Sequence, residues 1–130
     1  MTVEKLIELA KDAMQGAYAR YSGYKVGAAL LCADGTVYTG CNIENAAFTP
    51  TVCAERVAFF KAVSDGHREF TAIAVCGGKD GVITDIFPPC GVCRQVMREF
   101  VRDDFAVYMV RPEGFEMRTL AQLLPDSFIL

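Results

Sequence analysis

The sequence predicts an α/β fold with one mixed sheet between two helical layers, a three-layer αβα arrangement in a single domain over residues 1–130. Three observations support this prediction. Apolar residues recur with helical spacing at the start of the chain, and the runs at 26–32, 70–76 and 105–110 are almost entirely apolar, as buried strands are. Helical spacing returns between successive runs, and this alternation is typical of α/β proteins.

The first part of the chain predicts a helix followed by a β-hairpin. Residues 3–19 carry apolar side chains at the spacing of one helix face, and Thr2 is available as an N-cap. The Asp-Gly pair at 34–35 is the commonest signal for a two-residue hairpin turn. We therefore expect the strand at 26–32 to be followed by an antiparallel strand at about 36–43.

Prolines and capping signals place the later elements. Pro50 prevents a helix through the connector at 46–52, so a helix should begin near Cys53. The central strand at 70–76 should follow it. The remaining elements expected, in order, are a helix from about 90 to 101, a strand at 105–110, and a short helix that a capping box at Thr119 opens and Pro125 ends.

Composition limits the classes of partner. A hydrophobic content of 52% with 22% charged residues predicts a globular chain rather than a disordered one. The net charge of −3 and the absence of a basic run argue against binding to nucleic acid, which needs a dense Lys/Arg footprint. The N-terminus lacks the apolar core of a signal peptide, and no apolar run reaches transmembrane length. We expect a cytoplasmic protein that binds a small molecule and no membrane.

Three cysteines stand in two short segments, each followed by helix-spaced apolar residues: Cys53-Ala54-Glu55-Arg56 and Pro89-Cys90-Gly91-Val92-Cys93-Arg94-Gln95. Both segments should place their thiols near helix N-termini. There the unpaired backbone N–H groups and the helix dipole stabilise the thiolate, which is the form that binds metal.

The cysteine pattern favours an open zinc site. Cys90 and Cys93 alone could form a redox pair or half of a structural zinc site, and Cys53 supplies a third soft ligand. The chain has one histidine, His67, which falls in a polar turn, so no fourth ligand is evident and one position stays open for water. A structural zinc site and a redox pair remain the alternatives. The other three cysteines, Cys32, Cys41 and Cys76, are expected to be small buried hydrophobes rather than disulfides.

Glu55 and Arg56 lie beside the expected zinc ligands. Glu55 is two residues beyond Cys53, as in the zinc deaminases, where a glutamate is the general acid and base and a P-C-x-x-C segment follows. Alone, Glu55 would be read as a carboxylate favoured at a helix start. Three thiolates and Zn²⁺ sum to −1, and Arg56 could offset this charge through hydrogen bonds to sulfur. The alternative for Arg56 is a solvated helix residue.

Asn42 and Glu44 lie two residues apart at the end of the second expected strand, and so on one face of it. A carboxylate beside an amide can hydrogen-bond a pair of sugar hydroxyls. A polar strand end explains the same two residues equally well, and spacing leaves both interpretations open.

Four ordered motifs give the chain a resemblance to a known family: residues 21–30 (YSGYKVGAAL), 40–47 (GCNIENAA), 53–56 (CAER) and 89–95 (PCGVCRQ). Together they resemble the small homotetrameric cytidine deaminases over nearly the whole chain. The resemblance implies that family's five-stranded mixed sheet. It implies zinc on Cys53, Cys90 and Cys93, Glu55 as proton shuttle, and Asn42 with Glu44 on the ribose hydroxyls.

The resemblance also implies a site shared between subunits. Tyr24, Val26 and the main chain at Ala54 would border the pyrimidine. Residues from a neighbouring subunit, Ala46, Phe48 and Phe128, would enter the site, so that monomers would be inactive. Tyr24 stands where the family pattern leads us to expect phenylalanine, and Phe48 where we expect tyrosine.

The function that the resemblance implies is zinc-dependent hydrolysis of cytidine or deoxycytidine to the corresponding uridine and ammonia, in pyrimidine salvage. A free nucleoside is favoured over a nucleotide, since Glu44, Lys25 and Arg56 are the only charges expected nearby and no phosphate-binding glycine loop is present. The rivals are a deaminase of another aminopyrimidine such as blasticidin S, a polynucleotide-editing deaminase, and a zinc-stabilised module without activity.

Overall fold

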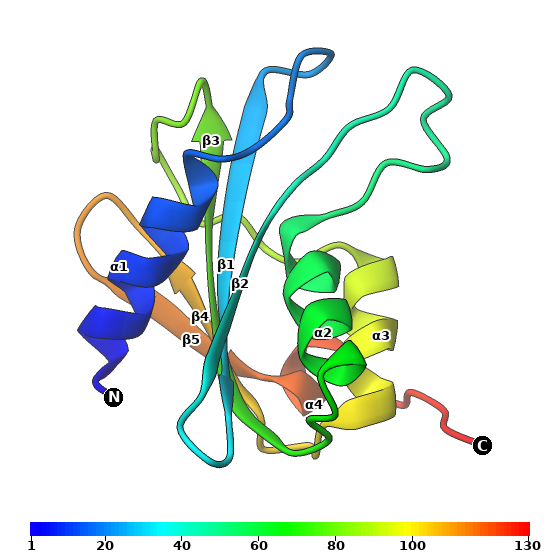
Figure 1. The fold of residues 1–130 in the computed structure, drawn as a ribbon. Coiled ribbons are helices and arrows are strands. Elements are labelled where there is room, and N and C mark those ends of the chain that lie inside the picture. Colours follow the sequence, from blue (N-terminus) through cyan, green and yellow to red (C-terminus); the bar gives the residue numbers. More distant parts are fainter.

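A computed structural model describes residues 1–130 and contains one five-stranded sheet in the order β2-β1-β3-β4-β5 (Figure 1). The elements in chain order are α1 (Val3–Met14), β1 (Tyr24–Cys32), β2 (Val37–Cys41), α2 (Ala54–Ser64), β3 (Phe70–Lys79), α3 (Gly91–Phe100), β4 (Ala106–Val110), β5 (Phe115–Thr119) and α4 (Leu120–Leu123). No helix is long and apolar enough to span a membrane.

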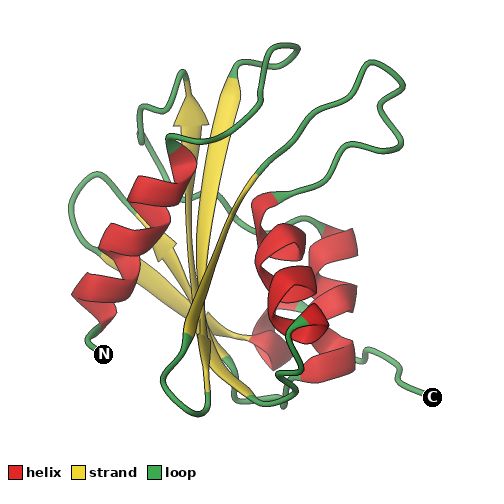
Figure 2. Ribbon diagram, in the orientation of Figure 1, coloured by secondary structure: helices red, strands yellow, loops and turns green.

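The sheet is mixed, as the sequence predicts. β1 pairs antiparallel with both β2 and β3, β3 pairs parallel with β4, and β4 pairs antiparallel with β5. Helix α1 covers one face of the sheet, and the other three helices cover the opposite face (Figure 2). The predicted three-layer αβα architecture is therefore confirmed.

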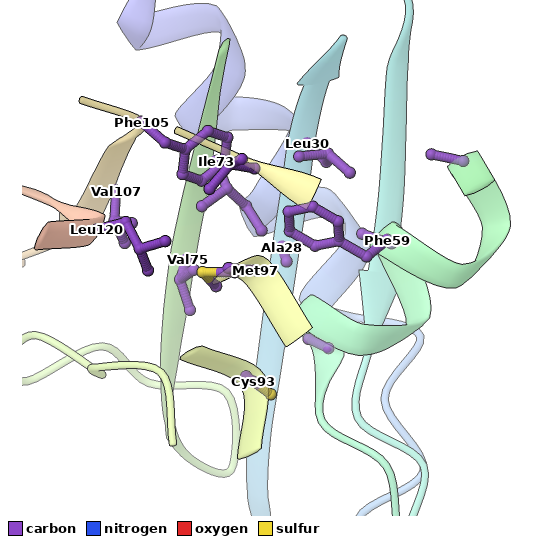
Figure 3. Packing of buried hydrophobic residues seen from close by; sticks show 14 of the residues in the cluster. Ala28, Leu30, Phe59, Ile73, Val75, Cys93, Met97, Phe105, Val107 and Leu120 are labelled. Carbon is purple, nitrogen blue, oxygen red and sulfur yellow. The ribbon is translucent and has the colours of Figure 1, made fainter. Parts of the chain in front are cut away.

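The two faces of the sheet carry separate apolar cores. Seventeen buried residues lie between the sheet and α2, α3 and α4, and nine lie mainly under α1. Phe59 of α2 sits in the larger core, with its ring centroid within 6.3 Å of the rings of Phe70, Phe100 and Phe105 (Figure 3). This packing ties the middle of α2 to the C-terminal end of α3.

Two local predictions were wrong in detail. The helix predicted at 3–19 ends at Met14, because Tyr18 exchanges backbone hydrogen bonds with residues 42 and 44 and so must be extended. The hairpin turn has three residues rather than two: the Cys32 N–H donates to the Thr36 carbonyl at 2.8 Å, and Gly35 has a φ of 92°. Such a left-handed glycine is typical of three-residue hairpin loops.

Strand β5 was not assigned from its own residues. Its sequence, FEMRT, mixes charged and apolar side chains, and it lies at the sheet edge with Phe115 and Met117 exposed. Pairing with β4 makes this segment a strand, and that pairing is not visible in local sequence. The capping box at Thr119 is confirmed, with both of its hydrogen bonds to Gln122 present.

We expect Gly40→Ala to destabilise the protein by about 1–3 kcal/mol, as overpacking does. A Cβ at position 40 would lie 2.3 Å from the Ala54 carbonyl oxygen and 2.7 Å from the Ala58 nitrogen, so the start of α2 would have to move off β2. Urea unfolding measures the change. Gly91→Ala is the control, because its Cβ would meet nothing within 4 Å. Equal stabilities for the two variants would contradict the close approach.

Candidate active site

The three predicted cysteines come together where two helices begin. Cys53 is the N-cap of α2 and Cys90 the N-cap of α3, and Cys93 lies in the first turn of α3. The Sγ atoms of Cys53 and Cys90 are 3.6 Å apart, and all three lie within 4.8 Å of one another. No disulfide joins them, and no histidine or carboxylate completes the cluster. The arrangement therefore has three sulfur donors and no fourth protein ligand.

Polar contacts favour the thiolate of Cys53. The Cys93 thiol and the Arg56 guanidinium donate to its sulfur, with Arg56 Nη2 at 3.5 Å, and these contacts lower the pKa of Cys53 to about 5. Cys93 donates the hydrogen bond in its contact with Cys53 and is also buried, and both effects raise the pKa of Cys93. Burial opposes the charge of Arg56, yet hydrogen bonds to Cys53 and Cys93 outweigh it and raise the pKa of Arg56. Arg56 is thus a neighbour of the sulfur cluster and not a solvated helix residue.

Glu55 is buried beside the sulfur cluster. It stands in the first turn of α2 with 3% of its surface exposed, and its Oε1 has no hydrogen-bond partner. Burial raises the pKa of Glu55 to about 7. A carboxyl group that titrates near neutrality can both accept and donate a proton at ordinary pH, which is what a general acid and base requires.

A cavity of about 230 Å³ joins the sulfur cluster to the polar residues predicted from β1 and β2. Glu55 and Cys90 lie at one part of its wall, and Asn42 and Glu44 at another. The predicted pyrimidine-bordering residues Tyr24 and Val26 also line it; the main chain of Ala54 follows Cys53 directly. Most of the predicted site residues thus line or adjoin one cavity.

Asn42 and Glu44 are held in place by the residues around Ser22. The Asn42 side chain donates to the Tyr24 carbonyl at 2.8 Å and accepts from the Val26 N–H at 2.9 Å. The Glu44 carboxylate accepts from the Ser22 hydroxyl and N–H and from the Tyr21 N–H. These bonds, above all that from the hydroxyl, lower the pKa of Glu44 and keep it ionised. Both residues thus line the cavity and also stabilise the neighbouring chain through hydrogen bonds.

Comparison with known proteins places the chain in a family. Residues 1–109 match the family model described as "Cytidine and deoxycytidylate deaminase zinc-binding region". The chain belongs to this deaminase family. A cytidine deaminase from Sporosarcina psychrophila is 53% identical over 98% of this chain and 92% of its own length, and one from Halalkalibacterium halodurans is 46% identical over 98% and 95%. The crystal structure of a cytidine deaminase from Burkholderia pseudomallei superposes with a TM-score of 0.91 at 45% identity, covering 98% of this chain and all of that one.

The residues of this deaminase fit a zinc ion. Three sulfur atoms are gathered, and three thiolates with Zn²⁺ carry a net charge of −1 that the Arg56 guanidinium offsets. The unpartnered Oε1 of Glu55 lies buried beside them and would be free to accept a hydrogen bond from a water molecule. Zinc is therefore the cofactor of this chain, and Cys53, Cys90 and Cys93 are the residues available to hold it.

The three residues predicted to enter a neighbouring subunit's site do not line the cavity of their own chain. Ala46 and Phe48 belong to the loop between β2 and α2, where Phe48 is 73% exposed and has a φ of 64°. Phe128 is 68% exposed in the C-terminal segment, and its carbonyl accepts from the Gln95 side chain. Neither aromatic lines this cavity, although Phe48 lines an adjoining one together with Ser22 and Glu44. Their assignment to a neighbouring subunit's site remains a prediction.

Ser22 and Phe87 are among the cavity residues that the sequence analysis did not single out, and both contact predicted site residues. Ser22 lines the cavity and bonds Glu44, and Phe87 lies against Tyr24 with ring centroids 6.3 Å apart. Ser22 stands within one of the family motifs, so the motif was a signal for it. Phe87 is only three residues before Cys90, but nothing local indicates that a loop aromatic turns toward Tyr24.

Proposed function

We propose that residues 1–130 form one catalytic domain that hydrolyses cytidine or deoxycytidine to uridine or deoxyuridine and ammonia. The observation that carries this proposal is the buried, unpartnered Glu55 carboxyl beside three sulfur donors in one cavity. Membership of the deaminase family and the 53% identity to a cytidine deaminase support the same reaction. A zinc module without activity would have no use for this carboxyl, whose burial is costly.

The residues of this chain divide the chemistry between them. Cys53, Cys90 and Cys93 would hold zinc, which supplies a Lewis acid that makes water a good nucleophile near neutral pH. Glu55 accepts a proton from the attacking water and delivers it to N3 of the pyrimidine, while the water oxygen bonds to C4. Glu55 then carries the second water proton to the amino group, so that the C4–N bond breaks and ammonia leaves.

Two groups of residues in the cavity hold the substrate, one at the sugar and one at the pyrimidine. We assign Asn42 and Glu44 to the sugar hydroxyls, because both are held rigidly by hydrogen bonds and both face the cavity. Tyr24, Val26 and the main chain at Ala54 border the pyrimidine. No cluster of lysine or arginine lines the cavity, which favours a free nucleoside over a nucleotide.

The reaction is tested by mixing the protein with substrate and following the ultraviolet absorbance, with zinc content measured on the same sample. We expect the absorbance to fall with cytidine or deoxycytidine, and to fall much more slowly with cytidine monophosphate and blasticidin S. Faster turnover of blasticidin S than of both nucleosides would reassign the substrate. Zinc without turnover of any aminopyrimidine would favour the inactive module.

Arg56→Ala should keep zinc but lower the rate at neutral pH by about tenfold and move the acid limb of the pH–rate profile to higher pH. Without the guanidinium the site carries a net negative charge, so water there gives up its proton less readily. Arg56→Lys, which keeps the charge, should lie between the variant and the wild type. A profile unchanged in Arg56→Ala would reject this role.

Glu44→Gln should lower kcat/KM for cytidine by about tenfold, because a charge-assisted hydrogen bond to the sugar is lost. With 2′,3′-dideoxycytidine, which lacks both hydroxyls, variant and wild type should differ little. Thermal unfolding controls for the contacts of Glu44 with Ser22. An equal fall with both nucleosides would mean that Glu44 acts only by holding the Ser22 turn.

We also propose a homotetramer with shared active sites, in which Ala46, Phe48 and Phe128 enter the cavity of a neighbouring subunit. The exposure of both aromatics, outside the cavity of their own chain, supports this arrangement. Sedimentation tests it: a fully active monomer would refute the proposal. The six free cysteines suit a reducing compartment, and we place the enzyme in cytoplasmic pyrimidine salvage.

A further inference from the structure

A second cluster of metal-ligating side chains lies away from the active site. The Cys32 sulfur, an Asp34 carboxylate oxygen and a ring nitrogen of His67 lie within 4.8 Å of one another. Cys32 ends β1, Asp34 is in the hairpin loop, and His67 lies just beyond the C-terminus of α2. Helix α2 has 11 residues and would span about 16 Å, so it separates this cluster from Cys53 at its other end (Figure 1).

Local contacts hold the three ligand groups in position. One oxygen of Asp34 accepts the Thr36 N–H at 3.0 Å, which leaves Oδ2 facing His67 Nδ1 at 3.8 Å. The backbone N–H of His67 donates to the Ala62 carbonyl at 3.0 Å, and the His67 ring packs edge-on against Tyr38 with centroids 5.2 Å apart. The separation of 3.8 Å is too long for a hydrogen bond, so the carboxylate and the imidazole are close without satisfying each other.

The two chain segments that supply the ligands are also tied together. The Ala33 N–H in the hairpin loop donates to the Glu69 carbonyl at 2.9 Å, and Cys32 is 1% exposed at the edge of the larger core. The relative position of hairpin and turn is therefore set without a ligand. Little rearrangement would be needed to close the three donors around one ion.

The donor set matches zinc-like ions. Thiolate, imidazole and carboxylate are the three side-chain ligands of Zn²⁺ in proteins, and together with Zn²⁺ they give zero net charge. Burial, and then the charge of Asp34, raise the pKa of Cys32, so its thiol holds its proton until a cation displaces it. Metal binding must supply the free energy needed to remove this proton. The cluster should therefore bind a metal more weakly than the three-cysteine site does.

We propose that Cys32, Asp34 and His67 form a second, weaker site for a divalent transition metal, Zn²⁺ above all, that ties the β1–β2 hairpin to the turn after α2. On binding, the Cys32 S–H bond breaks, its proton goes to solvent and a sulfur–metal bond forms. His67 binds through the lone pair of its neutral ring, and Asp34 through its ionised carboxylate. The site stabilises the fold and takes no part in the reaction.

Cobalt titration of the zinc-loaded enzyme tests the proposal. We expect a thiolate-to-cobalt charge-transfer absorption that saturates at one Co²⁺ per chain without release of zinc. His67→Gln and Asp34→Asn should each weaken cobalt binding by at least about tenfold. Glu69→Gln is the matched control, since it removes a negative charge from an exposed side chain nearby and should bind cobalt as the wild type does.

Thermal unfolding gives a second readout. Excess Zn²⁺ should raise the Tm of the zinc-loaded wild type but not that of His67→Gln, because a ligand that binds only the folded state stabilises it. Deamination should be unchanged in His67→Gln. The proposal is overturned if no absorption develops, if zinc is released in step with it, or if it is as strong in His67→Gln as in the wild type.

Discussion

Glu55→Gln is expected to lower kcat by at least about 100-fold, the usual contribution of a general acid and base. Glutamine keeps the shape and hydrogen-bonding atoms of the side chain but cannot carry a proton between water, N3 and the leaving amine. The other carboxylate on the cavity, Glu44, accepts hydrogen bonds from Ser22 and Tyr21 that keep it ionised, so it is not placed to take over. Steady-state rates with cytidine measure the loss.

The same variant should bind zinc and nucleoside as the wild type does, since Glu55 is not among the three gathered ligands. Metal analysis and equilibrium binding of cytidine check both points. Glu99→Gln is a matched control, because Glu99 is exposed on α3. A Glu55→Gln enzyme with a tenth or more of wild-type kcat would remove this residue from the mechanism.

Cys90→Ala is expected to reduce zinc from about one ion per chain to less than about 0.1 after dialysis against metal-free buffer, with loss of activity in proportion. Two remaining thiols make a poor zinc site, and the Cys93 N–H at the start of α3 also loses the sulfur that it bonds at 3.4 Å. Atomic absorption on the dialysed protein measures the metal. Dialysis also removes ions bound weakly elsewhere.

The Tm provides the second measurement for this variant. Zinc bound only by the folded state should raise the Tm of the wild type, and chelation should lower it to near that of Cys90→Ala. Cys41→Ala is the matched control, because Cys41 is a free cysteine outside both ligand clusters. Full zinc content in Cys90→Ala would exclude the three-sulfur site.

Much of the site could be predicted because its chemistry is encoded in short segments. The cysteine segments each open a helix, so Cys53, Cys90 and Cys93 are near helix N-termini in any fold that keeps α2 and α3. Asn42 and Glu44 share a cavity, as their spacing of two suggested, but spacing alone did not decide between a sugar site and a polar strand end. The structure shows that Glu44 also supports the Ser22 turn and that Asn42 also bonds the start of β1.

The elements that sequence analysis misplaced are set by pairing with other segments rather than by their own residues. The first helix is cut short at Met14 by the pairing of Tyr18 with residues near 43, and β5 exists because β4 offers it an edge. The partner of Tyr18 lies some 25 residues away along the chain and leaves no local signal. β4 is the preceding strand, but the mixed residues of β5 do not by themselves indicate that it pairs there.

The sequence by itself determined the α/β alternation, the three sulfur ligands and the adjacent carboxyl, because helix periodicity and motif spacing are properties of neighbouring residues. Tertiary structure alone decided that α2 and α3 start side by side, which brings Cys53 to 3.6 Å from Cys90. It also decided that Glu55 is buried and that His67 meets Cys32 instead of the active site. Burial and long-range contact come from packing across the sheet, and no local pattern records them.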